Sequence, residues 1–299
     1  MDVVRVPDAA FASLPDFPFA PHWLEQDGGL RMHYLDEGAG EPVLLVHGEP
    51  TWSFLWRKIV PPLVASGRRV VAPDHLGFGR SDKPTEVDWY SYDGHVAALT
   101  RLVEALDLRG LTVVVHDWGG PIGLRFAVEN EERVDRLVVL DTGISGGQAP
   151  SETWLRFRDA VRHAAGALDV GRLVAAGTAR GLADDVRAAY EAPFPTPESK
   201  AGARAFPELV PTEPEHPSAA PMNRVRDALR SWRKPALVVW GADDGVLPPA
   251  IAERFVELIP GATGPELVPD ASHFLQEDAP DEVAAAILRF AAHPDRGRR

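Results

Sequence analysis

The sequence predicts an α/β fold, with a mostly parallel central sheet flanked by helices and a helical cap inserted into it. Two observations support this. Short runs rich in β-branched residues alternate with longer helical patterns, which is the order expected of βαβ units. One segment, 143–225, breaks the alternation with Ala- and Arg-rich helical stretches and a proline-dense stretch.

Six short apolar runs are predicted to form strands, and the last also supplies a loop. All are rich in residues that favour buried strands. In chain order they are PVLLVHG (42–48), RRVVAPD (68–74), LTVVVHD (111–117), RLVVLDT (136–142), PALVVWG (235–241) and PELVPDASH (265–273).

Helices are expected between and after these strands. The helical patterns cover about 52–66, 93–107, 119–130, 248–258 and 280–292. The last residues, 293–299, are expected to be frayed, as chain ends commonly are.

The break in the pattern predicts two domains. The core domain comprises 1–142 and 226–299, and the helical cap domain comprises 143–225. We expect the cap to lie over the carboxyl edge of the sheet, where open α/β sheets bind their ligands.

The composition restricts the partners of the protein. It has 45% hydrophobic and 25% charged residues, which is ordinary for a globular chain, and a formal net charge of -13. Nucleic acids and anionic membranes require clustered Lys and Arg, so neither is expected. The absence of cysteine excludes disulfides and thiolate chemistry. With no signal-peptide pattern and no long apolar stretch, the expected location is the cytoplasm.

One predicted strand ends on an aspartate just before a predicted helix. In VVVHDWGGPIGLRF, 113–126, this aspartate is Asp117. A strand–turn–helix junction of this kind is strained and carries the nucleophile of many α/β enzymes. It needs small neighbours, which Gly119 and Gly120 provide. The alternative is that Asp117 only caps the helix.

The other members of a hydrolytic triad are found later in the chain. In enzymes with such a turn the chain order is nucleophile, acid, histidine. His273 lies in a loop before the last helix and is the predicted base. Asp244, in the loop after a late strand, is the predicted acid, while its neighbour Asp243 is expected to face solvent. Asp141, at the end of another strand, is the alternative acid.

Two backbone N–H groups are predicted to hold an oxyanion. The turn directs the N–H of Trp118, the residue after Asp117, above the sheet. The loop VHGEPTW, 46–52, follows an earlier strand and is placed to supply the N–H of Glu49.

Two further motifs are not expected to carry chemistry. GISGG, 143–147, matches Gly-x-Ser-x-Gly, but no helix follows it, so Ser145 is predicted to be a loop residue. GFGRSD, 77–82, lacks the third glycine and the helix of a dinucleotide-binding turn.

An aspartate nucleophile indicates displacement at a saturated carbon. The product is an alkyl ester, which a histidine-activated water can hydrolyse, whereas a serine would leave an ether. The bond broken is therefore a carbon–halogen bond or an epoxide. A departing halide needs only N–H donors, and Trp118 and Trp154 are the candidate indoles. An epoxide needs a phenol, and the cap holds one tyrosine, Tyr190.

These residues resemble the haloalkane dehalogenases of the α/β-hydrolase superfamily, and the resemblance extends over nearly the whole chain. The matching stretches are HGEPTWSFLWRK, PDHLGFGRSDKP, VVHDWGGPIGL, YEAPFPTPESKAGARAFPELVP and ASHFLQED.

The resemblance implies an α/β-hydrolase fold and the same triad, with Asp117 as nucleophile, His273 as base and Asp244 as acid. Because Glu49 stands where some members have a halide-binding Asn, the resemblance implies the branch that uses two tryptophans. It further implies a substrate pocket lined by Phe206 and Pro207.

The predicted reaction converts a haloalkane to an alcohol, a halide ion and a proton, with no cofactor and no metal. The expected partners are a small apolar halogenated substrate and a halide, and the protein is expected to be a monomer or weak oligomer. Two alternatives remain open: an epoxide hydrolase with the same nucleophile, and a non-catalytic binding protein on the same fold.

Overall fold

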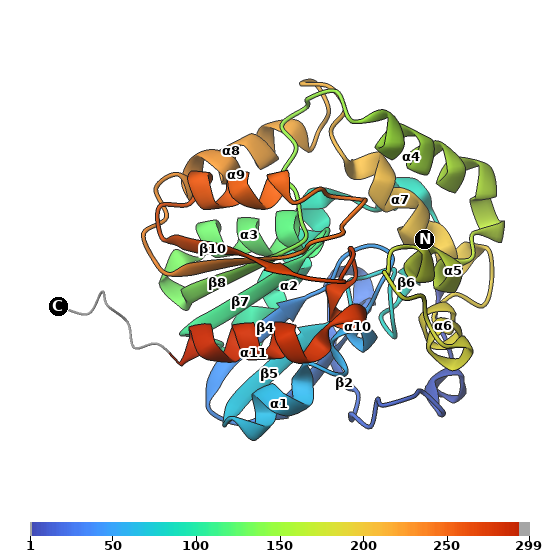
Figure 1. Ribbon diagram of the computed structural model, residues 1–299. Coiled ribbons are helices and arrows are strands. Elements are labelled where there is room, and N and C mark those ends of the chain that lie inside the picture. The colour runs from blue at the N-terminus through green and yellow to red at the C-terminus, as the bar shows by residue number, and fades with distance from the viewer. Residues whose placement is uncertain (1, 293–299) are drawn as a thin grey trace.

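The computed structural model describes residues 2–292, and it is built around one eight-stranded sheet (Figure 1). The strand order is β10-β9-β8-β7-β4-β5-β3-β2. The prediction for 293–299 lies outside the described residues. The strands of this sheet are β2 (His22–Glu25), β3 (Arg31–Gly38), β4 (Glu41–Val46), β5 (Arg68–Pro73), β7 (Leu111–His116), β8 (Val134–Leu140), β9 (Ala236–Gly241) and β10 (Ala262–Val268).

The sheet is mostly parallel, as predicted. Strands β5, β4, β7, β8, β9 and β10 run in one direction, whereas β3 is antiparallel to both of its neighbours. Strands β2 and β3 were not predicted, because neither carries a run of β-branched residues. The short antiparallel pair of β1 (Val3–Val4) and β6 (Lys83–Pro84) was not predicted either.

Helices cover both faces of the sheet. The core helices are α1 (Val60–Ala65), α2 (Tyr92–Ala105), α3 (Gly119–Glu129), α8 (Ala219–Leu229), α9 (Ala250–Leu258), α10 (Leu275–Asp278) and α11 (Pro280–Ala291). Helices α1 and α11 lie on one face, and α3, α8 and α9 lie on the other (Figure 1). Because both faces are covered, β4 and β7 are buried along most of their length and consist of nearly continuous apolar residues.

One predicted helix is interrupted. The pattern at 52–66 forms a single 3₁₀ turn, Ser53–Trp56, followed by α1. Pro61 and Pro62 occupy the first turn of α1, where their missing N–H groups are not needed. The prolines therefore favour a new helix start rather than continuation of the earlier turn.

The inserted segment forms a layer of helices beside the carboxyl ends of the parallel strands (Figure 1). Its helices are α4 (Glu152–Ala164), α5 (Val170–Ala176), α6 (Asp184–Glu191) and α7 (Ala201–Leu209). The expected junction at 225/226 lies inside α8, which contacts α3 of the core. We propose the division into core and cap with its second junction at the start of α8. Within residues 2–292, no helix is both long and apolar enough to cross a bilayer.

Candidate active site

The turn between β7 and α3 places Asp117 in a strained backbone conformation. Its φ is +49°, a value that non-glycine residues rarely adopt. Three hydrogen bonds hold the turn: Asp117 N to Asp141 O (3.1 Å), Gly120 N to Asp117 O (2.8 Å), and Thr142 Oγ1 to Asp117 O (2.6 Å). The strain is thus offset by contacts with the neighbouring strand.

Glycines let the surrounding chain approach this turn. A Cβ atom on Gly119 would collide with the backbone oxygen of Val46, and one on Gly120 would collide with the Thr142 side chain. A Cβ on Gly48 would lie 2.5 Å from the Trp118 N atom. The two glycines that the sequence analysis associated with the turn are therefore required by packing.

The structure brings Asp117, His273 and Asp244 together. His273 Nε2 lies 3.4 Å from Asp117 Oδ2, and His273 Nδ1 lies 3.0 Å from Asp244 Oδ2. All three come from loops at the carboxyl ends of strands: Asp117 follows β7, Asp244 follows β9, and His273 follows β10. Asp243, next to Asp244, is exposed.

Asp141 occupies a different position beside Asp244. It is fully buried, and its carboxyl oxygens accept the Gly241 N–H at 3.0 and 3.3 Å. Burial, and then the Asp244 carboxylate, raise the pKa of Asp141 well above its ordinary value. Burial beside Asp244 therefore favours the neutral form of Asp141, whose carboxyl group hydrogen-bonds to Asp244.

The charges of the three residues support one another. Burial opposes a charged imidazole, but the Asp244 and Asp117 carboxylates raise the pKa of His273 well above its ordinary value. Burial likewise opposes the Asp117 carboxylate, yet its interaction with the His273 imidazole, 3.4 Å away, lowers the pKa of Asp117. Without substrate, Asp117 is thus an ionised carboxylate, as a nucleophile must be.

Two backbone N–H groups are directed at the Asp117 carboxylate. Glu49 N lies 2.7 Å from Asp117 Oδ1, and the N–H of Trp118 also hydrogen-bonds to this carboxylate. Donors that hold a carboxylate oxygen here are placed to hold the same oxygen when it becomes a tetrahedral oxyanion. The Glu49 side chain is buried, and burial, followed by the Asp117 charge, raises its pKa well above the ordinary value, which favours its neutral form.

The Trp118 indole lies among aromatic residues. Its ring centroid is 5.1 Å from that of Phe206, edge to face, and 6.4 Å from that of Tyr92. Phe206 and its neighbour Pro207 are buried in α7 of the cap.

The position of Trp154 relates it less directly to this site than the position of Trp118 does. It lies in the first turn of α4, is half-buried, and has the Arg158 guanidinium 5.3 Å from its ring centroid. Among the described residues its ring makes no contact with that of Trp118. Ser145, as expected, is a loop residue, and its hydroxyl donates to Pro211 O (3.0 Å).

Two residues that hold the loop of His273 were not predicted from the sequence. His116, which immediately precedes Asp117, donates from Nε2 to His273 O at 2.8 Å. The Asp278 carboxylate accepts the Ser272 N–H at 3.0 Å. The position of His116 at the end of β7 was a usable signal, whereas no pattern in the chain marked Asp278.

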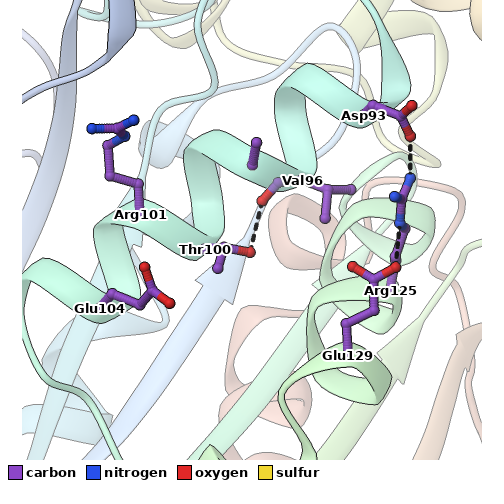
Figure 2. A pocket seen from close by; sticks show the side chains of 8 residues that line it. Asp93, Val96, Thr100, Arg101, Glu104, Arg125 and Glu129 are labelled. Atoms are coloured by element: carbon purple, nitrogen blue, oxygen red, sulfur yellow. Dashed lines mark hydrogen bonds and ion pairs between the residues drawn. The ribbon is translucent and has the colours of Figure 1, made fainter.

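A surface groove between α2 and α3 lies apart from this site. Figure 2 shows Arg125 between Asp93 and Glu129, with both carboxylates paired to its guanidinium. Thr100 donates its hydroxyl to the Val96 carbonyl (2.9 Å). The groove has no pairing of a nucleophile with a base, so it is not a candidate for catalysis.

Comparison with known proteins agrees with this geometry. Residues 41–280 match the family profile described as alpha/beta hydrolase fold. The chain is 47% identical over 302 residues to haloalkane dehalogenase 1 of Mycobacterium tuberculosis H37Rv, covering 97% of this chain and 99% of that protein. The chain belongs to the haloalkane dehalogenase family.

Two further haloalkane dehalogenases are similar over their whole length. That of Mycobacterium marinum is 45% identical over 298 residues, covering 97% of this chain and 100% of that protein. The solved structure of haloalkane dehalogenase DpaA from Paraglaciecola agarilytica NO2, described as tetrameric, superposes with a TM-score of 0.92 at 34% identity. This superposition covers 98% of this chain and 100% of that one. The predicted fold and family are thereby confirmed.

Proposed function

We propose that this protein hydrolyses haloalkanes to an alcohol, a halide ion and a proton. Asp117 is the nucleophile, His273 the base and Asp244 the acid that orients it. The observation that carries the proposal is the placement of an ionised aspartate, at a strained strand-to-helix turn, between the His273 imidazole and the Glu49 N–H.

In the first step an oxygen of Asp117 attacks the carbon that bears the halogen. The new carbon–oxygen bond forms as the carbon–halogen bond breaks, and the bonding electron pair leaves with the halide. The product is an alkyl ester on Asp117. We propose that the indole N–H groups of Trp118 and Trp154 hold the departing halide, and that Phe206 and Pro207 line the apolar substrate pocket.

In the second step water hydrolyses the ester. His273 takes a proton from the water as its oxygen attacks the ester carbonyl, and the N–H groups of Glu49 and Trp118 stabilise the oxyanion. Collapse of this intermediate expels the alkoxide, which takes the proton from His273 and leaves as the alcohol. The proton left on the Asp117 carboxyl then passes to His273, and the Asp117 carboxylate is restored. Esterification removes the charge of Asp117, so the imidazolium loses one of its two stabilising carboxylates and His273 becomes available as a base.

The alternatives have less support. An epoxide hydrolase would need a phenol to protonate the leaving alkoxide, and the cap tyrosine, Tyr190, is fully buried. Its hydroxyl donates to Glu277 at 2.5 Å. A binding protein would have no need for three matched catalytic groups in hydrogen-bonding order.

The test is release of halide from a panel of bromo- and chloroalkanes, with styrene oxide in parallel. Wild-type protein is expected to release bromide and leave styrene oxide intact, and Asp117→Asn is expected to release none. Asp243→Asn, which changes an exposed carboxyl beside Asp244, is the matched control and should retain activity. Halide release by Asp117→Asn equal to that of wild type would refute the proposal.

We further propose that the protein acts in the cytoplasm, with a small apolar haloalkane as substrate and halide as product. We retain the expectation of a monomer or weak oligomer, although the similar DpaA is described as tetrameric. Light scattering coupled to size-exclusion chromatography decides between these states.

A further inference from the structure

The segment that carries His273 ends at a residue with a buried carboxylate, Asp278. Asp278 ends α10, five residues after His273, and its side chain is almost fully buried. Its Oδ2 atom accepts the Ser272 N–H at 3.0 Å, so it holds the residue directly before the base. A carboxylate that accepts backbone N–H groups makes strong, charge-assisted hydrogen bonds.

The same carboxylate also holds the cap. The loop between α5 and α6 donates two N–H groups to it: Ala179 N to Oδ2 at 2.9 Å, and Arg180 N to Oδ1 at 3.3 Å. One side chain thus accepts from both the loop of the base and the cap. Because the two loops share this acceptor, a shift of either loop that moves the Asp278 carboxylate also disturbs the hydrogen bonds of the other loop.

A second contact lies next to the first. Phe274 N donates to Gly177 O at 3.1 Å, and a Cβ on Gly177 would lie 2.5 Å from the Phe274 ring. The Phe274 ring is itself edge to face with His273, at 4.9 Å between centroids. The cap loop therefore packs directly against the residue that follows the base.

Buried polar contacts extend the connection along α10. Glu277 accepts the Tyr190 hydroxyl from α6 of the cap, and it is paired with the buried guanidinium of Arg57. These contacts hold Glu277, the residue directly before Asp278. The segment 272–278 is consequently attached to the cap at several points.

We propose that Asp278 is a positioning residue that couples the cap loop 177–180 to the catalytic base His273. The inference rests on the function proposed above. His273 must stay within reach of the water that attacks the ester, and an error of about 1 Å in the position of a catalytic group can cost roughly a hundredfold in rate. Because the base acts in ester hydrolysis, loss of this coupling slows the second step more than the first.

The experiment resolves the two steps in Asp278→Asn with 1-bromobutane as the probe. Rapid-quench measurement of bromide follows ester formation, and mass spectrometry of the quenched protein detects the butyl adduct. Asparagine keeps the size of the side chain but offers only one acceptor oxygen to the donors from both loops. We expect a burst of about one bromide per protein, accumulation of the adduct, and a steady-state kcat roughly tenfold to a hundredfold below wild type.

A second variant and a matched control separate positioning from folding. Gly177→Ala leaves Asp278 unchanged but pushes the cap loop against Phe274, and it should produce the same burst. Asp82→Asn changes another buried carboxylate that accepts a backbone N–H, from Arg31 at 2.9 Å, with no contact to the loop of the base. It should lower the Tm and leave both steps at wild-type rates.

The outcomes distinguish the coupling from the function. If Asp278→Asn slows ester formation and hydrolysis equally, or changes only the Tm, the coupling is refuted while the proposed function stands. If wild-type protein releases no bromide and forms no adduct, both are refuted. A burst in Asp278→Asn and Gly177→Ala but not in Asp82→Asn supports the coupling.

Discussion

Nδ1 of His273 lies 3.0 Å from Oδ2 of Asp244, and the other oxygen of Asp244 accepts the N–H groups of Val246 (2.7 Å) and Leu247 (2.9 Å). The loop after β9 thus fixes the carboxylate, and the carboxylate fixes the imidazole with Nε2 facing Asp117. This arrangement favours a protonated Nδ1 and leaves Nε2 to exchange a proton with water.

The first prediction separates the two candidate acids. Asp244→Asn should lower kcat by about a thousandfold or more, because the amide no longer stabilises the imidazolium and favours the wrong tautomer. Asp141→Asn should change kcat by less than about threefold, since asparagine reproduces a neutral carboxyl that accepts from Gly241 N and donates to Asp244. Steady-state kinetics with one bromoalkane checks both, and the opposite ranking would assign the role to Asp141.

The second prediction concerns the charge of His273. Removing the Asp117 carboxylate in Asp117→Asn takes away one of the two groups that raise the pKa of His273, so this pKa should fall. NMR titration of the imidazole measures the change. Asp243→Asn serves as control and should leave the titration unchanged. An unaltered His273 pKa in Asp117→Asn would contradict the ion pair described here.

The same ion pair affects the pH dependence of stability. Because the pKa of His273 is raised in the folded protein, its contribution is fully present below the unfolded value of about 6.5. That contribution is lost as the pH rises through the folded pKa. In Asp117→Asn this loss should occur at lower pH. Urea unfolding of both proteins across this range provides the measurement.

The third prediction concerns His116. Burial is the main reason that its pKa is lowered to about 4, so the ring is neutral at pH 7 and Nε2 donates to His273 O. His116→Leu leaves that carbonyl without its donor and should reduce the free energy of unfolding by about 1–3 kcal/mol. His116→Gln, which retains an amide donor, should lose less. Equal losses in the two variants would show that packing, rather than the hydrogen bond, is the contribution of His116.

The fourth prediction tests the halide site by bromide binding, followed through tryptophan fluorescence. Trp118→Phe keeps an aromatic ring against Phe206 but removes the N–H donor, so the Kd for bromide should rise roughly tenfold or more. Trp154→Phe should have an effect of similar size, whereas Trp89→Phe, at an exposed position, should have none. A normal Kd in Trp154→Phe would remove Trp154 from the proposed site while leaving the role of Trp118 intact.

Local features of the sequence were sufficient to predict much of this protein. Buried parallel strands consist of continuous apolar residues, so β4, β7, β8 and β9 could be recognised without any knowledge of their partners. The turn at Asp117 was recognisable for a similar reason, because its strain requires small neighbours close in the chain. Strands β2, at the edge of the sheet, and β3, between β5 and β2, were not predicted because their mixed polar and apolar residues carry no such signal.

Only the tertiary structure distinguishes the positions of Asp244 and Asp141, and our proposal of Asp244 as the acid rests on that difference. Each of the two aspartates follows one of two neighbouring parallel strands, so their positions in the sequence do not tell them apart. They differ in the direction in which their side chains point. Asp244 faces His273, whereas Asp141 turns toward the Gly241 N–H. The same holds for Asp278, whose donors in the cap lie about one hundred residues earlier in the chain. The positions of the buried strands and of the strained turn depend on residues close in the chain, so the sequence alone determines them. Contacts between distant loops depend on how the whole sheet and its cap pack, so only the tertiary structure shows them.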